Sequence, residues 1–433
     1  MIKISSIIKL YNISSLIYLV AVLSLLNYLY IVKESYMGFY SIFILSIYIL
    51  ILLELWIDKK IVHVLSVTGF FYILLYYLPY YDYTHYPFNY RWGYSDITKL
   101  YVPTNLALQS HIVFLISYKI IKNFSKKTLP MPKNFNLSLF SKNINLLFVF
   151  ILFIFVLFFT KTYGHHDISG AGAYLYLILL VGGFIPYGLF LVDRVFTGFV
   201  VQVLITLALF KAEANGAAIL TLVWFFVLLY LYKKEYKKYF YAIVLVAISL
   251  VWIVLQNKYT FNDGANFYKV LMDAFVINMG RLEQLHSIHD VYHNGLLDYT
   301  WHYFITAPFT YLFTFFLHFK VNYADEVTKV IYNTKDMWGS IGGCSTGSAY
   351  SDLGYFGIYI YFIFYGVIAG FIEKIKLNSK LNLVFYIFGL LFVYHSINEG
   401  FRLDDIYFLI IPIFLLSKIT LFKQRNKEIC KLN

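Results

Sequence analysis

The stretches NMGRLEQLHSIHDVYHNG (Asn278–Gly295) and GSIGGCSTGSAYSD (Gly339–Asp352) are polar segments in an otherwise strongly apolar chain. Both belong to one polar interruption that runs from Asn257 to Ala349 and has long apolar segments on either side. The first stretch has the composition of a helix. The second, rich in glycine and hydroxyl groups, predicts a turn followed by a helix that begins near Tyr350. A polar segment of this length is unusual in such an apolar chain, and we expect it to serve catalysis.

The composition excludes an ordinary soluble domain. Hydrophobic residues make up 60% of the chain, charged residues only 13%, and the mean hydropathy is +0.68. Repeated apolar runs of about twenty residues are what a bilayer requires of spanning helices. The net charge of +12 does not indicate a nucleic-acid partner, because the basic residues form short clusters between apolar runs. Such clusters are typical of membrane orientation signals.

These patterns predict an all-α polytopic membrane protein with about twelve transmembrane helices. We expect a single integral membrane domain, 1–433, in which residues 257–349 form a large extracytoplasmic loop with interfacial or re-entrant helices. The predicted spans are 11–32, 36–56, 61–81, 104–121, 144–163, 171–192, 196–211, 214–232, 239–256, 350–372, 382–397 and 406–422. The first run has no cleavage site after it, so we expect a retained span and not a signal peptide.

The basic clusters orient these spans. KKEYKK (Lys233–Lys238), EKIKLNSK (Glu373–Lys380) and the tail KQRNKEICK (Lys423–Lys431) are expected in the cytoplasm, as are both termini. The apolar segment Tyr303–Phe319 would invert everything after it if it crossed the membrane. It is short and contains Pro308, so we interpret it as re-entrant or interfacial on the outer side.

The loop histidines His286, His289 and His293 have helical spacing, which places them on one face with Asp290 adjacent to it. Three histidines near acids can bind a metal, but no HExxH-like element accompanies them, and we expect no metal. A general-base or sugar-binding role for one of them stays open beside plain surface polarity. The two cysteines, Cys344 and Cys430, are expected on opposite sides of the membrane, which excludes a disulfide between them.

Charged residues at the outer ends of spans are the best functional candidates, because charge is costly in lipid. Arg281 in the loop and Arg402 before the last span suit a diphosphate, since arginine matches phosphate oxygens. Lys211, at the turn KAEANG (Lys211–Gly216), is a further cation on that side. The alternative is that these charges only pair with their neighbours at the membrane surface.

The glycine-rich stretch offers a second candidate region. Its backbone N–H groups precede a helix and favour an anion or a sugar hydroxyl, and Ser345, Thr346 and Ser348 add hydroxyls. Asp352 is expected in the first turn of that helix. A helix cap with tight packing explains the same residues without any ligand.

The order of these features resembles a known family. The turn KAEANG, the Arg-containing loop helix, a GxxTGxxYxxxGxxG-like passage (Gly343–Gly357) and the turn NEGFRLDD (Asn398–Asp405) are similar to those of Wzy-type polysaccharide polymerases. These are the O-antigen and enterobacterial-common-antigen polymerases, and the resemblance covers about residues 200–410. One departure is Glu213, which stands where the common-antigen enzyme has an arginine.

The resemblance implies a glycosyltransferase of the GT-C type in the bacterial cytoplasmic (inner) membrane. It would polymerise undecaprenyl-diphosphate-linked oligosaccharide repeat units at the outer face, without cofactor or metal. The bilayer, a chain-length regulator and a flippase are its implied partners. The expected catalytic residues are Arg281, Arg402, Glu399, Asp352 and His302. The expected substrate-binding residues are Lys211, Ser345, Thr346, Ser348, Asp404, Asp405 and His286.

Within this set, the arginines would stabilise the departing diphosphate, which is mainly an electrostatic task. Glu399, Asp352 and His302 are alternative general bases for the acceptor hydroxyl. Three other functions stay open: an O-antigen ligase, a flippase or transporter of the same lipid-linked sugars, and a structural membrane protein. A flippase should carry polar residues inside its spans, whereas here they concentrate at outer ends and in one loop.

Overall fold

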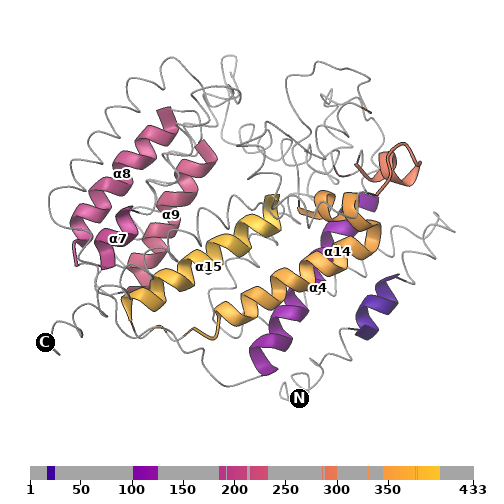
Figure 1. The fold of residues 1–433 in the computed structure, drawn as a ribbon, viewed down its shortest axis with the longest axis horizontal. Helices are drawn as coiled ribbons and strands as arrows, with labels where there is room; N and C mark the ends of the chain where they lie inside the picture. The colour runs from indigo at the N-terminus through magenta and orange to yellow at the C-terminus, as the bar shows by residue number, and fades with distance from the viewer. Residues whose placement is uncertain are drawn as a thin grey trace, which may run out of the picture. The chain divides into compact units, whose positions relative to one another are not determined.

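The computed structural model describes the chain in part. The described residues are 17–24, 101–124, 185–191, 193–211, 215–232, 285, 288–299, 330, 345–375, 377 and 379–399. This part is almost entirely α-helical and contains no β-strand. Its helices cluster into two compact units, one with α4 and α14 and the other with α7, α8 and α9, while α15 contributes residues to both. Figure 1 shows these helices with their labels.

Helix α14 (Ser345–Ile372) is the one described helix that is long and apolar enough to cross a membrane. Its 28 residues would extend to about 42 Å as a straight helix, which exceeds the hydrocarbon thickness of a bilayer. Two residues interrupt it, since Leu353 and Gly354 have non-helical backbone angles. Gly354 has a φ of 59° and a ψ of −139°, a combination that is open to glycine and strained for other residues.

The structure corrects the predicted turn Gly339–Asp352 from Ser345 onward, because residues 345–352 are helical. Serine hydroxyls make this possible by bonding to carbonyls of the preceding turn. The Ser348 hydroxyl donates to the Ser345 carbonyl (3.4 Å) and the Ser351 hydroxyl to the Ser348 carbonyl (2.9 Å). Asp352 therefore lies at the end of a first helical segment, just before the break, and not in the first turn of the helix as predicted.

Helix α4 (Tyr101–Phe124) packs along α14, and the two helices run in the same direction. The tyrosine hydroxyl of Tyr359 donates to Gln109 (2.9 Å), and further along both helices Gly370 lies against Ile121. Gly366 and Gly370 are spaced as small-xxx-small, so α4 approaches the backbone of α14 closely. A Cβ on Gly370 would lie 2.7 Å from the Ile121 Cβ.

One face of α14 is left exposed by this packing. Phe356, Ile360, Phe364 and Phe371 are 66%, 50%, 38% and 44% exposed, and their spacing of four and seven residues places them on one stripe. The described part of the chain thus gives α14 one small-residue face toward α4 and one aromatic face away from the unit. A row of exposed apolar side chains of this kind marks a contact surface, either for another protein or for lipid.

The second unit contains α7 (Ile185–Leu191), α8 (Val195–Lys211) and α9 (Asn215–Tyr232). Pro186 lies in the first turn of α7, where its missing N–H costs nothing. α8 packs against α7 and α9, and Figure 1 shows α8 and α9 side by side. Their ends agree with the predicted spans 196–211 and 214–232, so the turn KAEANG is flanked by helices as expected.

Lysine 380, the first residue of α15 (Lys380–Glu399), joins α15 to the end of α7. It pairs with the carboxylate of Asp193, and its ammonium lies 5.7 Å and 5.4 Å from the ring centroids of Phe190 and Tyr232. Asp193 has a φ of 66° and ends α7, because the Arg194 N–H reaches back to the Leu189 carbonyl (2.9 Å). Through the ion pair and the two ring contacts, Lys380 therefore holds the ends of α7 and α9 close to the start of α15.

Candidate functional site

The site is built where a segment of the predicted outer loop meets the break in α14. Residues 288–299, here called the docking segment, begin as a helix and then turn. The turn is a Schellman motif, in which Leu296 N–H donates to the Val291 carbonyl (3.0 Å) and Gly295 N–H to the Tyr292 carbonyl (3.2 Å). Gly295 has a φ of 67°, as that motif requires. The motif directs the chain from His289 toward Tyr299.

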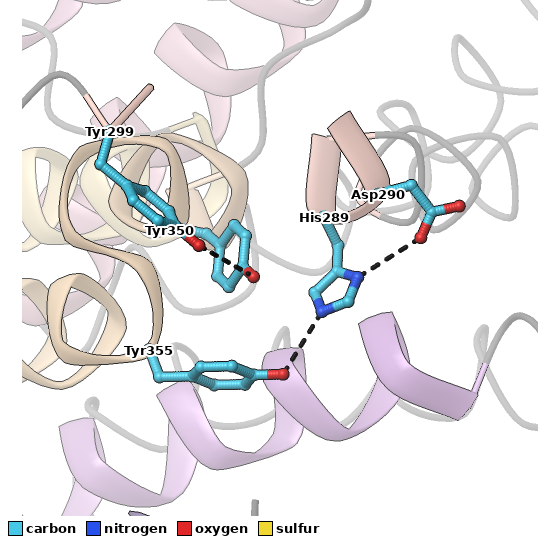
Figure 2. A network of polar contacts seen from close by, with 5 residues as sticks. All are labelled: His289, Asp290, Tyr299, Tyr350 and Tyr355. Carbon is cyan, nitrogen blue, oxygen red and sulfur yellow. Dashed lines mark hydrogen bonds and ion pairs between the residues drawn. The ribbon is translucent and has the colours of Figure 1, made fainter. Parts of the chain in front are cut away.

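His289 is the centre of the site. It is 7% exposed, and both of its ring nitrogens face polar groups (Figure 2). Nδ1 lies 3.4 Å from the Asp290 carboxylate, and Nε2 lies 3.3 Å from the hydroxyl of Tyr355 on α14. With the proton on Nδ1, the ring donates to Asp290 and accepts from the Tyr355 O–H.

Aromatic rings hold His289 in this position. The Tyr350 ring centroid is 5.1 Å from that of His289, and the His293 ring stacks on His289 at 5.2 Å. The stacking places both histidines on one helical face, as their spacing predicts. The hydroxyl of Tyr299 donates to that of Tyr350 (3.4 Å, Figure 2), and the Tyr299 ring lies against Gly354. The docking segment is thus anchored at the position where the helix is broken.

The order Asp290, His289, Tyr355 is that of a proton relay. A carboxylate fixes the tautomer of an imidazole, and the imidazole presents its second nitrogen to a hydroxyl. The two contacts of 3.4 Å and 3.3 Å are long, and catalytic hydrogen bonds tighten when substrate binds. Such an arrangement can accept a proton from a substrate hydroxyl or return one to a leaving group.

Asp352, a predicted general base, has a different environment. It is completely buried, and its carboxylate accepts a hydrogen bond from the Tyr361 hydroxyl one helical segment later. That bond spans the break at Leu353 and Gly354. This contact gives Asp352 a structural role, because it joins the two segments of α14.

The three hydroxyl-bearing residues predicted to bind substrate are also buried. Ser345, Thr346 and Ser348 are 1%, 6% and 3% exposed. Thr346 contacts the hydroxyl of Ser110 on α4 (3.2 Å), and Ser348 bonds to the backbone. The buried Ser345 hydroxyl makes no hydrogen bond among the residues that the structure describes. Packing against α4 therefore explains Thr346, as the helix-cap alternative anticipated, while Ser345 retains bonding capacity.

Most other predicted site residues lie outside the described residues. This group comprises Arg281, His286, His302, Arg402, Asp404 and Asp405. Lys211 is the last residue of α8 and Glu399 the last residue of α15, and their side chains also lie outside the described part. The predicted turn NEGFRLDD begins later than expected, because α15 continues to Glu399. The structure therefore brings together Asp352 and the three hydroxyl residues, all on the first segment of α14.

Sequence reasoning missed Tyr350 and Tyr355 as members of the site. Tyrosine is so abundant in this chain, with 43 residues, that no single one stands out. The contact between His289 and Tyr355 joins residues 66 positions apart, and no local sequence pattern predicts it. The available signal was the spacing of Tyr350 and Tyr355 on either side of Gly354, in the same passage that carries the family resemblance.

No group of three or more His, Cys, Asp or Glu side chains within the described ranges is arranged to hold a metal ion. His289 and Asp290 are adjacent, but His289 directs its second nitrogen to a tyrosine hydroxyl, which is a poor metal ligand set.

Comparison with known proteins adds no relative. No family model matches the chain, and no curated protein or solved structure matches it either. Function must therefore be argued from the residues themselves.

Proposed function

We propose that this chain is a multi-pass membrane glycosyltransferase of the polysaccharide-polymerase type. It joins oligosaccharide repeat units carried on a polyprenyl diphosphate, at the outer face of a bacterial cytoplasmic membrane. In this proposal, about twelve transmembrane helices surround the site, and both termini lie in the cytoplasm. The lipid-linked chain is the donor, and a hydroxyl of the incoming unit is the acceptor.

The observation that carries the proposal is the division of α14 into a polar end and an apolar body. Its first segment buries hydroxyls and the Asp352 carboxylate, and His289 of the docking segment packs on Tyr350 of this segment and contacts Tyr355 just beyond the break. Its second segment exposes the aromatic stripe that includes Phe356 and Phe364. Polar chemistry at one end of a lipid-facing helix suits a substrate with a lipid tail and a sugar head group.

The directions of the helices support the topology. α4 and α14 run parallel, which fits the odd number of predicted spans between them. Lys380 pairs with Asp193, which fits the even number of predicted spans between those two residues. Both relations favour a segment Tyr303–Phe319 that does not cross the membrane, because one further crossing would reverse each parity. Those residues themselves lie outside the described part.

The proposed reaction requires a cation for the leaving group and a base for the acceptor at this site. The departing diphosphate needs cationic stabilisation, for which Arg281 and Arg402 remain our candidates because guanidinium groups bind phosphate oxygens bidentately. The acceptor hydroxyl needs a base. Lys211, Asp404, Asp405 and His286 are retained as substrate-binding candidates on the same predicted side.

A flippase for the same substrate is the second candidate, because α4 carries buried polar side chains within its length. These are Asn105, Gln109, Ser110, His111, Ser117 and Lys119. Two of them make hydrogen-bond contacts with α14, since Gln109 accepts from Tyr359 and the Ser110 hydroxyl contacts that of Thr346, and the His111 ring packs on Phe362. Interhelical hydrogen bonding explains these two residues without a transport path, so we favour the polymerase.

Deletion of the gene in its own host separates the functions. Surface glycans run on a gel should show a single repeat unit on the acceptor if a polymerase is lost. A lost flippase should give no surface glycan, and a lost ligase should give polymer that is not attached to its acceptor. An unchanged glycan ladder would refute all three functions.

A further inference from the structure

We propose that Tyr355 is the catalytic residue that takes the proton from the acceptor hydroxyl, acting in a relay with His289 and Asp290. This inference rests on the proposed function and deepens it, because it replaces the three alternative bases with one defined group. His289 and Asp290 are positioning residues in this scheme, since they act through the tyrosine.

The geometry gives each member a distinct task. Tyr355 lies directly after the break in α14 and is only partly buried, so its hydroxyl lies at the edge of the site. His289 is buried, and the Tyr355 hydroxyl lies 3.3 Å from its Nε2. Asp290 is more exposed and lies against Nδ1 at 3.4 Å. Among the described residues, His293 and Tyr350 are further titratable side chains whose rings contact the imidazole.

The proposed step forms one glycosidic bond and breaks the bond between the donor sugar and its diphosphate. The acceptor hydroxyl oxygen attacks the anomeric carbon of the donor, and its proton passes to the Tyr355 oxygen. The Tyr355 proton moves at the same time to His289 Nε2, and the Asp290 carboxylate stabilises the imidazolium. The bond between the anomeric carbon and the diphosphate oxygen breaks, and the lipid diphosphate leaves with the electron pair. His289 then returns its proton through Tyr355 to water.

Asp352 is a less suitable candidate for this role. It is completely buried and already accepts the Tyr361 hydroxyl, so a substrate hydroxyl would have to displace that bond. Tyr355 is partly exposed, and the described partner of its hydroxyl is the His289 imidazole. The break at Gly354 contributes here, because it separates Tyr355 from the regular helical register of Tyr350 and lets both rings surround His289.

The test uses the full-length protein purified into liposomes together with lipid-linked repeat units extracted from the deletion strain. The variants are Tyr355→Phe, His289→Ala and Asp290→Asn, with Leu296→Ala as the matched control because this exposed side chain of the docking segment lies outside the relay. Loss of general-base catalysis predicts a fall in kcat of roughly 10²–10⁴-fold for the first two, with KM unchanged. Asp290→Asn should lose less, and Leu296→Ala should retain wild-type kcat.

A rescue experiment separates catalysis from packing. Added imidazoles should restore turnover to His289→Ala, with a rate that rises with the basicity of the added compound. Rescue that follows only the size of the compound, or wild-type kcat in Tyr355→Phe, would overturn the relay. Tyr355→Phe removes one oxygen atom, so this arm remains informative if His289→Ala fails to fold. If the wild-type protein elongates nothing, the proposed function itself fails and the relay falls with it.

Discussion

Lys380 pairs with Asp193 although the two residues are 187 positions apart. The pair closes one end of the unit formed by α7, α8 and α9, where the Lys380 ammonium also lies over two aromatic rings. An exposed ion pair of this kind contributes little stability by itself, and Asp193 is 80% exposed. Its value is topological, because two paired residues must lie on the same side of any membrane that the helices cross.

The topology predicts opposite labelling of two exposed leucines. Leu377, 48% exposed and close to Lys380, should be cytoplasmic, and Leu296, 61% exposed on the docking segment, should be outside. In a background of Cys344→Ser and Cys430→Ser, a membrane-impermeant maleimide should label Leu296→Cys in spheroplasts. Leu377→Cys should react only after the membrane is opened. Labelling of both from the same side would contradict the single crossing predicted between Leu296 and Leu377.

The α4–α14 contact predicts that Gly366 tolerates no side chain. A Cβ there would lie 2.7 Å from the Ser117 Cβ, in addition to its overlap with the backbone of α4. Gly366→Ala should destabilise the fold by about 1–3 kcal/mol, the usual cost of overpacking. The measurement is thermal unfolding in detergent. Ile360→Ala, on the exposed stripe of the same helix, is the control and should unfold near the wild-type temperature.

Asp352 and Tyr361 should behave as one structural unit. Asp352→Asn and Tyr361→Phe each remove or weaken a hydrogen bond to a buried carboxyl group, and a buried polar group that loses its partner costs about 1–3 kcal/mol. Each variant should therefore unfold at a lower temperature than wild type, and the double variant should lose less than the two single losses combined. A thermally normal Asp352→Asn protein without turnover would instead make Asp352 the catalytic base.

The arginines outside the described residues carry the electrostatic part of the proposal. Arg281→Ala and Arg402→Ala should each lower the elongation rate by roughly 10²–10³-fold, since each removes a donor that stabilises developing charge. Lysine at either position should restore part of the rate, because it keeps the charge but not the planar fork. Wild-type glycan ladders in cells that carry either alanine variant would remove both residues from the site.

Chelation tests the expectation of metal-independent transfer. Treatment of the reconstituted protein with EDTA should leave the elongation rate unchanged, because the proposal stabilises the diphosphate with arginines. A loss of activity that divalent cations reverse would require a metal in the mechanism. Chelator that has been saturated with calcium beforehand serves as the control.

Within the described residues, the positions of the helices could largely be predicted from the sequence, because the apolar runs mark them. The bounds of α8 and α9 lie within about one residue of their predicted spans, because hydrophobic length is a local property. The first segment of α14 could not be predicted, because serine and glycine in a row favour a turn unless tertiary contacts intervene. Here Thr346 packs on α4 and serine hydroxyls bond back to the helix.

The candidate site was predictable only in part. The polar passage and Asp352 were recognised because unusual composition is visible in a single sequence. The pairing of His289 with Tyr355 was not, since it depends on the docking segment folding back onto a broken helix. The role of Asp352 changed for the same reason, because its partner Tyr361 lies beyond a break that the sequence did not reveal.

The most direct measurement of the central claim is chain elongation by the purified protein alone. Liposomes should contain the wild-type protein and lipid-linked repeat units extracted from the deletion strain, and glycan length and released lipid diphosphate are followed together. The account predicts a ladder that grows by whole repeat units, with one lipid diphosphate released for each unit added. Units that cross the bilayer without growing, or that remain unchanged, would contradict it.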